Sequence, residues 1–186
     1  GKVQSKQIEG VLTPTEDYGI SEDFIKEFTP QYNAVKLFVS KKIGTFTEDI
    51  STRPAYFGPS AFIDFIHSLQ LDISGADISF TAPLSFDAEI KEGDIHVSDM
   101  FNLYKYENML YVMTLSGREI KDVLEASYYM WTNQMKSPDD HLLWFKKKRR
   151  EGAEDRASFQ NFSFNFDSAA GIIYTVDVTK PQGEKV

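Results

Sequence analysis

Residues 103–110 read LYKYENML and residues 115–121 read LSGREIK, and these two runs define the central unit of the chain. Residues 108–115 read as a β-strand, with Leu110, Val112 and Thr114 on one face. Ser116 and Glu119 follow with the S-x-x-E spacing of a capping box, in which each side chain accepts the other residue's backbone N–H. We therefore expect a strand that leads directly into a capped helix.

The sequence after this capping box predicts a helix, a loop and a hairpin. The helix carries an apolar stripe at helical spacing that ends at Trp131. Residues 133–160 are polar and heavily charged, which predicts a long loop. Beyond it, residues 161–166 alternate with period two, and residues 172–178 follow a glycine, so the two segments predict a hairpin.

Upstream of the central unit, the N-terminal part of the chain predicts helices and a short strand. Ser21 offers an N-cap, because its hydroxyl can accept an orphan N–H of the first turn. Pro30 is predicted to kink or split that helix, so that a second helical segment covers about residues 31–42. Residues 43–50 read as a short strand.

The helix predicted after Ser60 has the clearer signals. Its apolar residues recur at i, i+3, i+4 and i+7, and Gly75 stands where a helix C-terminus favours glycine. Residues 77–80 then predict a strand, and residues 81–98 a loop with a turn at Gly93. This order of elements predicts an α+β fold with a mixed sheet and packed helices. We expect residues 1–54 to lead into the domain as a linker strand and helices, and residues 55–186 to form it.

Composition excludes several classes of protein. The 186 residues are 41% hydrophobic and 26% charged, which is typical of a globular domain. No apolar run approaches the roughly 20 residues of a membrane-spanning helix, so no span is expected. The net charge of −8 argues against a nucleic-acid polymer as partner, because phosphate neutralisation needs basic residues. The absence of cysteine removes disulfides, thiol nucleophiles and cysteine-ligated metals.

The sequence carries no motif for catalysis or metal binding. His67, His96 and His141 lack the spacing of a metal site, and His67 is expected at a helix surface or boundary. No G-x-S-x-G, Walker loop or G-x-G-x-x-G is present. The basic run at residues 146–150 is followed by acidic residues, which favours a solvated loop over an anion site. We therefore predict no catalytic residue, no metal ligand and no resident cofactor in this chain.

Two tyrosines and an amide stand close together just before the predicted strand: Tyr104, Tyr106 and Asn108. An aromatic face beside an amide suits a flat heterocycle, because the ring stacks and the amide bonds an edge. Stacking of a base on an aromatic side chain contributes about 1–3 kcal/mol. The alternative interpretation is ordinary packing of the tyrosines across strands.

The same stretch resembles the C-terminal domain of the 5'-nucleotidase family. The L-Y-x-Y-x-N pattern of residues 103–108 is closest to the branch of 2',3'-cyclic-nucleotide 2'-phosphodiesterases/3'-nucleotidases. Three further stretches match the family in order and spacing: GADISF at residues 75–80, GDI at 93–95, and NFD at 165–167 with the Gly-Tyr-Asp-Val-Pro pattern that follows. The resemblance covers about residues 55–186.

The resemblance implies a function shared between two domains. In the family, a separate N-terminal calcineurin-like domain carries two divalent metal ions and hydrolyses the phosphoester. The C-terminal domain holds the nucleoside between aromatic rings and delivers the phosphate by rotating. For this chain the resemblance implies that Tyr106 stacks on the base and Asn108 contacts it, with Arg53, Ser60 and Asp64 as further pocket residues. It also implies a nucleotide or nucleoside ligand, a metallophosphoesterase domain in cis or from a neighbouring gene, and a periplasmic or cell-envelope location.

Two departures from the family pattern bear on function. Residues 81–87, TAPLSFD, lack the arginine that ends the glycine-rich loop of 5'-nucleotidases, which favours the cyclic-phosphodiesterase branch. The family's second stacking aromatic and Gly-Gly turn lie in a later segment than Val186, so the domain is expected to lack its last part.

Two function hypotheses remain open. The first is a nucleotide-recognition domain that is inactive alone. The second is a non-catalytic binding or structural module that retains the fold without the site. On this second hypothesis Arg53 is a loop cation, Ser60 a helix cap and Asp64 a surface carboxylate.

Overall fold

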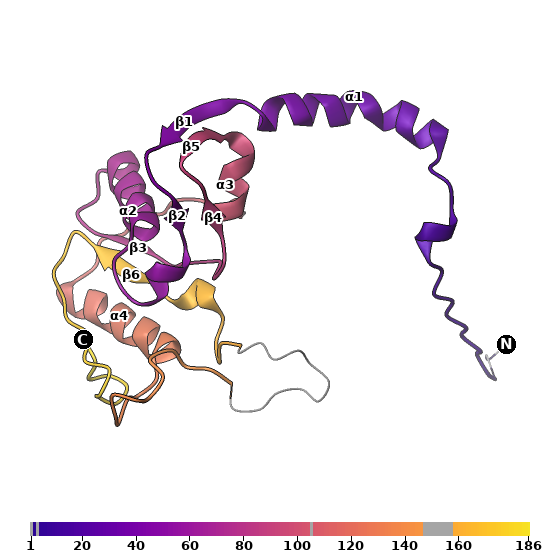
Figure 1. The fold of residues 1–186 in the computed structure, drawn as a ribbon. Coiled ribbons are helices and arrows are strands. Elements are labelled where there is room, and N and C mark those ends of the chain that lie inside the picture. The colour runs from indigo at the N-terminus through magenta and orange to yellow at the C-terminus, as the bar shows by residue number, and fades with distance from the viewer. Residues whose placement is uncertain (1, 3, 105, 147–157) are drawn as a thin grey trace. The chain divides into compact units, whose positions relative to one another are not determined.

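Residue 40 divides the chain into an N-terminal unit, residues 1–40, and a C-terminal unit, residues 41–186. The computed structural model describes residues 2, 4–104, 106–146 and 158–186 (Figure 1). The C-terminal unit begins before residue 54, where we placed the domain boundary, because strands in the intervening segment pair with strands further along the chain. No helix in the described part of the chain is long and apolar enough to cross a bilayer.

The N-terminal unit contains the 3-10 helix η1 (Thr15–Asp17) and the helix α1 (Glu22–Val39). The predicted N-cap is confirmed, since the backbone N–H of Phe24 donates to the hydroxyl of Ser21 over 3.3 Å. The prediction that Pro30 splits the helix was wrong, because α1 runs through it. Proline removes a single backbone donor, and here the hydrogen-bond ladder continues on both sides.

The helix α2 (Ala61–Ser74) confirms the predicted helix after Ser60 in the C-terminal unit. The Ser60 hydroxyl accepts from the N–H of Ile63, and Gly75 ends the helix at a φ of 65°, in the left-handed region that favours glycine. One side of α2 packs against the strands β3 (Ser79–Thr81) and β6 (Ser168–Ala170). This packing brings β6, from late in the chain, beside α2 and β3, which follow one another in the sequence (Figure 1).

The described strands form three antiparallel pairs. β1 (Lys42–Phe46) pairs with β5 (Gly93–His96), β2 (Ile50–Ser51) with β4 (Glu89–Ile90), and β3 with β6. In the last pair Phe80 stands opposite Ala169. The α+β class is confirmed, whereas the predicted mixed sheet is replaced by these short pairs, because each strand is only two to five residues long.

The prediction of a loop over residues 81–98 was wrong in its second half. β4 and β5 lie there, and the short helix α3 (Val97–Leu103) follows at once. Asp99 caps this helix, because its carboxylate accepts the backbone N–H of His96 over 2.7 Å. Strands this short carry too little alternation to be distinguished from loop.

The helix α4 (Gly117–Trp131) begins at the predicted capping box. The N–H of Ser116 donates to the Glu119 carboxylate over 2.7 Å, and the N–H of Glu119 donates to the Ser116 hydroxyl over 3.4 Å. At its other end Trp131 lies between two rings, stacked on Tyr128 with 5.0 Å between centroids and on Phe166 with 5.8 Å. This aromatic stack is the centre of the larger of two apolar cores.

Residues 108–115 do not form the predicted strand. Within the described chain they pair with no strand, and Leu110–Leu115 line a cavity of about 410 Å³ together with residues 76–80. The residue types of this segment favour an extended chain, but a strand ladder also needs a partner segment within hydrogen-bonding distance.

The predicted hairpin of residues 161–166 and 172–178 was also wrong. The first segment contains the 3-10 helix η3 (Ser163–Asn165), and β6 pairs with β3 instead. Gly171 ends β6 with a φ of 88°, and a Cβ there would stand 2.0 Å from the carbonyl oxygen of Asp77. Only glycine fits this close backbone contact.

The long loop predicted over residues 133–160 is partly described. Two isolated bridges, Thr132 with Leu143 and Phe145 with Phe159, order its two ends. Apart from Lys146, the basic run at residues 146–150 lies outside the described residues.

Candidate functional site

Tyr106 and Asn108, the two residues predicted to contact a base, line one cavity of about 460 Å³, here called the Tyr106 cavity. The segment after α3 brings the tyrosines and the amide to it, and β3 and the residues after it form a wall. The segment around η3 contributes further side chains. The lining residues are Gln70, Phe80, Thr81, Ala82, Leu84, Tyr104, Tyr106, Asn108, Phe164 and Asp167.

The amide of Asn108 is held by a neighbouring phenol. Its Nδ2 donates to the hydroxyl of Tyr104 over 2.7 Å. This hydrogen bond leaves Oδ1 and the second N–H of the amide for a ligand. The Tyr106 side chain is 52% exposed, so a ring and a positioned amide lie at the same cavity.

Phe164 and Asp167 also line the Tyr106 cavity, and the sequence analysis assigned neither of them a role in the site. Phe164 is 56% exposed and stacks on Phe162 at 5.2 Å and 8° between planes. Burial raises the pKa of the Asp167 carboxyl above its usual value. Asp167 is the only charged side chain among the described residues that line this cavity. The period-two pattern of residues 161–166 placed the phenylalanines on one face of the segment. It did not show which cavity that face reaches.

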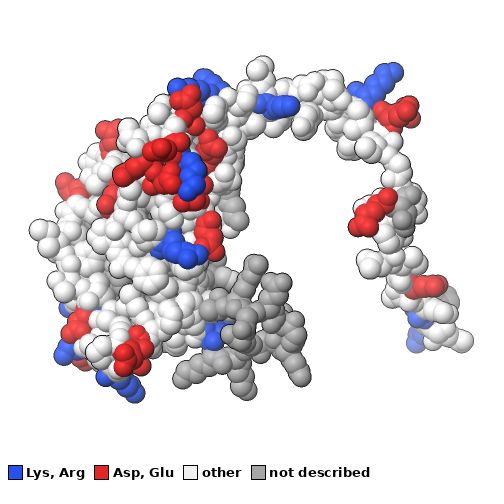
Figure 2. Space-filling view, viewed as in Figure 1, with Lys and Arg blue, Asp and Glu red and all other residues white. Residues whose placement is uncertain are grey.

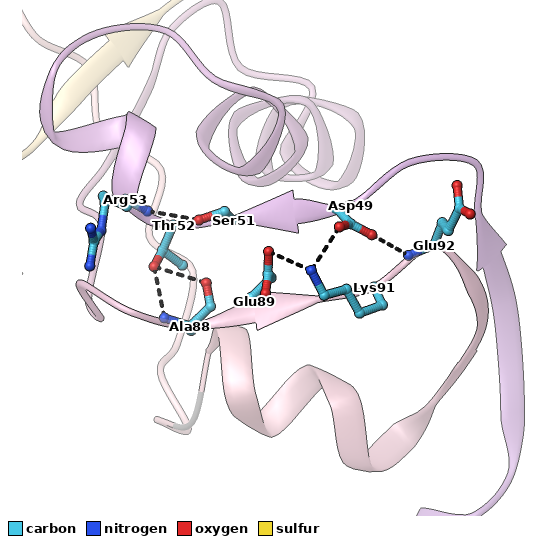
Figure 3. Close-up of polar contacts among 8 residues, drawn as sticks. All are labelled: Asp49, Ser51, Thr52, Arg53, Ala88, Glu89, Lys91 and Glu92. Atoms are coloured by element: carbon cyan, nitrogen blue, oxygen red, sulfur yellow. Dashed lines mark hydrogen bonds and ion pairs between the residues drawn. The ribbon is translucent and has the colours of Figure 1, made fainter.

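Arg53 lies outside the Tyr106 cavity, in the 3-10 helix η2 (Arg53–Tyr56). Its guanidinium forms an ion pair with Asp87 and lies 4.8 Å from the centroid of the Phe86 ring. Figure 3 shows it beyond Ser51 and Thr52, at the end of the β2–β4 pair. These contacts make Arg53 a paired surface cation, and the structure does not place it among the residues that line the Tyr106 cavity.

The opposite end of the β2–β4 pair carries a small network of ion pairs. Lys91 lies 2.8 Å from Asp49 and 2.9 Å from Glu89 (Figure 3). The hydrogen bond with Lys91 lowers the pKa of Asp49. Figure 2 shows acidic and basic side chains side by side over this part of the C-terminal unit. These exposed pairs contribute little to stability, and among described residues no cluster of three or more His, Asp or Glu could hold a metal ion.

Ser60 and Asp64 also lie away from Tyr106. Ser60 caps α2, and Asp64 lines a second cavity of about 580 Å³, here called the aromatic-core cavity. Its other walls come from α4 and the chain after β6, including Tyr128, Trp131 and Tyr174. Of the predicted site residues, Tyr106 and Asn108 therefore line one cavity. The other three, Arg53, Ser60 and Asp64, lie elsewhere.

The buried polar groups of the aromatic-core cavity are bonded within the protein, whereas the Asp64 side chain is exposed. Trp131 Nε1 donates to the carbonyl of Tyr56 over 3.2 Å, and the hydroxyls of Tyr128 and Tyr174 are 2.9 Å apart. His67 is buried, which corrects the prediction of a surface or boundary position. Burial lowers its pKa. Its ring nitrogens contact two serine hydroxyls, Ser79 at 3.0 Å from Nδ1 and Ser168 at 3.1 Å from Nε2.

Comparison with known proteins identifies the family. The profile of the 5'-nucleotidase C-terminal domain matches residues 42–186, which is the C-terminal unit almost from end to end. The chain belongs to this family. Within this 5'-nucleotidase C-terminal domain, both the segment with the tyrosines and amide and the segment around η3 lie in the matched range.

Individual relatives agree with the family assignment. The chain is 33% identical over 98 residues to the trifunctional nucleotide phosphoesterase protein YfkN of Bacillus subtilis, covering 52% of this chain and 6% of that protein. It is 23% identical over 210 residues to the 2',3'-cyclic-nucleotide 2'-phosphodiesterase/3'-nucleotidase of Salmonella typhimurium, covering 97% of this chain and 31% of the relative. The chain thus spans less than a third of either relative.

A solved structure shares the fold. It is described as a 5'-nucleotidase from Staphylococcus aureus in complex with alpha-ketoglutarate, and it superposes with a TM-score of 0.65 at 22% identity. The match covers 90% of this chain and 30% of that one. The likeness therefore establishes that this chain shares its fold with part of that protein.

Proposed function

We propose that the chain is the nucleotide-recognition part of a metal-dependent nucleotide phosphohydrolase. The Tyr106 cavity carries this proposal, because it combines a half-exposed ring with an amide that Tyr104 positions. Tyr106 stacks on the base and Asn108 bonds its edge. Phe164 supplies a second exposed ring at the same cavity.

Hydrolysis belongs to a separate domain in this proposal. The described residues include no cluster that fits a pair of divalent metal ions. The resemblance to the family, and the names of the phosphodiesterase relatives, support a calcineurin-like domain that supplies the metals, in cis or from a neighbouring gene. The chain orients the substrate, so that the entropy cost of reaching the reactive geometry is met by binding. A periplasmic or cell-envelope location is part of the same proposal.

Calorimetric titration of the chain with adenosine and with ribose tests the proposal. We expect adenosine to bind and ribose not to bind, because the cavity contacts the base. The affinity should be modest, since few groups contact the ligand and association itself costs free energy. Absence of binding to either ligand would refute this proposal and support a module that retains the fold without the site.

A phosphatase assay tests the assignment of hydrolysis to another domain. The chain with added Mn²⁺, Co²⁺ or Zn²⁺ should release no phosphate from 3'-AMP, 5'-AMP or 2',3'-cyclic AMP. Turnover that survives repurification and disappears in the Tyr106→Ala variant would show that this chain is a complete enzyme.

A further inference from the structure

Asp167 stands at the Tyr106 cavity on a fixed backbone. It lies between η3 and β6, and its carbonyl oxygen accepts a hydrogen bond of 2.8 Å from the hydroxyl of Ser127 on α4. β6, which follows at once, pairs with β3. The backbone therefore holds the Asp167 side chain at the wall that it shares with Tyr106 and Asn108.

Among the described acids of the C-terminal unit that are buried or partly buried, Asp167 differs from the others. Asp99 accepts from the backbone of His96, Glu125 from the backbone of Lys185, and Asp140 from the backbone of Lys136. Among the described residues, none donates a hydrogen bond or forms an ion pair with the Asp167 carboxylate. Its raised pKa has desolvation as the sole cause. A half-buried carboxylate without a donor costs free energy, and a bound ligand can supply the donor.

The chemistry of the cavity limits what that donor can be. An ionised carboxylate only accepts hydrogen bonds, and it repels a phosphate. The hydrogen-bond donors of a nucleoside are the amino or imino groups of the base and the hydroxyls of the ribose. No Lys or Arg is among the described lining residues that could counter a phosphate charge inside the cavity. We therefore expect the nucleoside to lie inside the Tyr106 cavity and its phosphate to lie outside the cavity.

We infer that Asp167 is a specificity-determining residue of the Tyr106 cavity, whose carboxylate accepts a hydrogen bond from the bound nucleoside. This inference rests on the proposed function, because it requires that a nucleoside occupies the cavity. The donor is a base amino group or a ribose hydroxyl, and the experiment below distinguishes the two.

The test is calorimetric titration of the full chain and its Asp167→Asn variant with three ligands. Adenosine carries both kinds of donor, purine riboside lacks the amino group, and 2',3'-dideoxyadenosine lacks the 2'- and 3'-hydroxyls of the ribose. Substitution should weaken adenosine about tenfold, the cost of a hydrogen bond to a charged group. The analogue that lacks the contacted donor should bind the unaltered chain about as weakly as adenosine binds the Asp167→Asn variant. The substitution should not weaken the binding of that analogue any further.

A second readout separates recognition from a structural role. Without ligand, Asp167→Asn should melt at the same temperature as the unaltered chain or higher, because a neutral amide is cheaper to desolvate than a carboxylate. The matched control is Asp72→Asn, an exposed acid of α2, which should change neither melting nor binding. If Asp167→Asn and Asp167→Ala both melt lower or fail to fold, Asp167 is structural and the inference is overturned.

The outcomes also separate this inference from the proposed function. If the unaltered chain binds no nucleoside, the proposed function fails and the inference fails with it. If the unaltered chain binds adenosine and Asp167→Asn binds it equally well, the inference alone fails.

Discussion

The aromatic-core cavity and the Tyr106 cavity are both rich in aromatic rings, but their polar atoms are bonded differently. In the aromatic-core cavity the indole N–H of Trp131 and the hydroxyl of Tyr128 are bonded within the protein. In the Tyr106 cavity the Asn108 amide keeps an oxygen available, and the Asp167 carboxylate has no donor among described residues. The larger cavity thus belongs to the core, whereas the smaller one has the groups that recognise a ligand. Volume alone is a poor guide to a binding site.

Removing the central ring of the core should have the largest effect. Trp131 is 3% exposed and lies between two stacked rings. Trp131→Ala should destabilise the chain by about 3–5 kcal/mol, because it leaves a cavity as well as losing burial. Denaturant unfolding measures this. A change below about 1 kcal/mol would contradict the assignment of this cavity to the core.

Removing the exposed ring should affect binding and leave stability unchanged. Tyr106→Ala should weaken adenosine by about 1–3 kcal/mol through the loss of stacking. Its matched control is Tyr111→Ala, since Tyr111 is 79% exposed, lies in the same segment and does not line the Tyr106 cavity. Calorimetry and thermal melting should show weaker binding with an unchanged melting temperature for the first variant alone. Equal effects of both substitutions would remove Tyr106 from the site.

A smaller effect is expected from the phenol that holds the amide. Tyr104→Phe removes only the hydroxyl that accepts from Asn108, so adenosine affinity should fall by about 1 kcal/mol. In an Asn108→Ala background the same substitution should have almost no effect, because the phenol then has no amide to position. Additive losses would show that Tyr104 acts independently of Asn108.

Protonation of His67 at acid pH should lower the stability of the folded chain. This is the smallest of the expected effects. Burial lowers the pKa of His67 in the folded chain below its ordinary value of 6.5. The unfolded chain therefore takes up the proton first as pH falls. The stability that the neutral ring provides is complete above pH 6.5 and is lost as pH falls toward the lower folded pKa. Unfolding of His67→Asn should be less pH-dependent between about pH 6.5 and 5 than that of the unaltered chain. An unchanged slope in that range would exclude His67.

The sequence predicted those elements whose signals are local. Ser21, Ser60, Gly75 and the Ser116–Glu119 box fix helix ends through bonds within one turn, and all are found in place. The mixed sheet, the strand at residues 108–115 and the hairpin after residue 160 were not found. Each of these depended on which segment pairs with which, and alternation carries no information about the partner.

The site divides in the same way. Tyr106 and Asn108 are two residues apart on one segment, so their proximity could be predicted. Asp167 and Phe164 reach the cavity only because β6 pairs with β3. The family resemblance implied that Arg53 is a pocket residue. In the structure its guanidinium forms an ion pair with Asp87 and lies over the ring of Phe86.

The hydrogen bonds around His67 also fix where its proton lies. Ser79 donates its hydroxyl proton to the amide oxygen of Gln70 over 2.6 Å, so its oxygen must accept from His67 Nδ1. These bonds favour the Nδ1–H tautomer, in which Nε2 accepts from Ser168 over 3.1 Å, a shorter distance than the 3.5 Å from the Ser168 hydroxyl to the carbonyl oxygen of Thr81. The less common tautomer has a distinct pair of ¹⁵N chemical shifts. One imidazole signal can thus report whether α2, β3 and β6 are assembled, in any variant described above that leaves His67 in place.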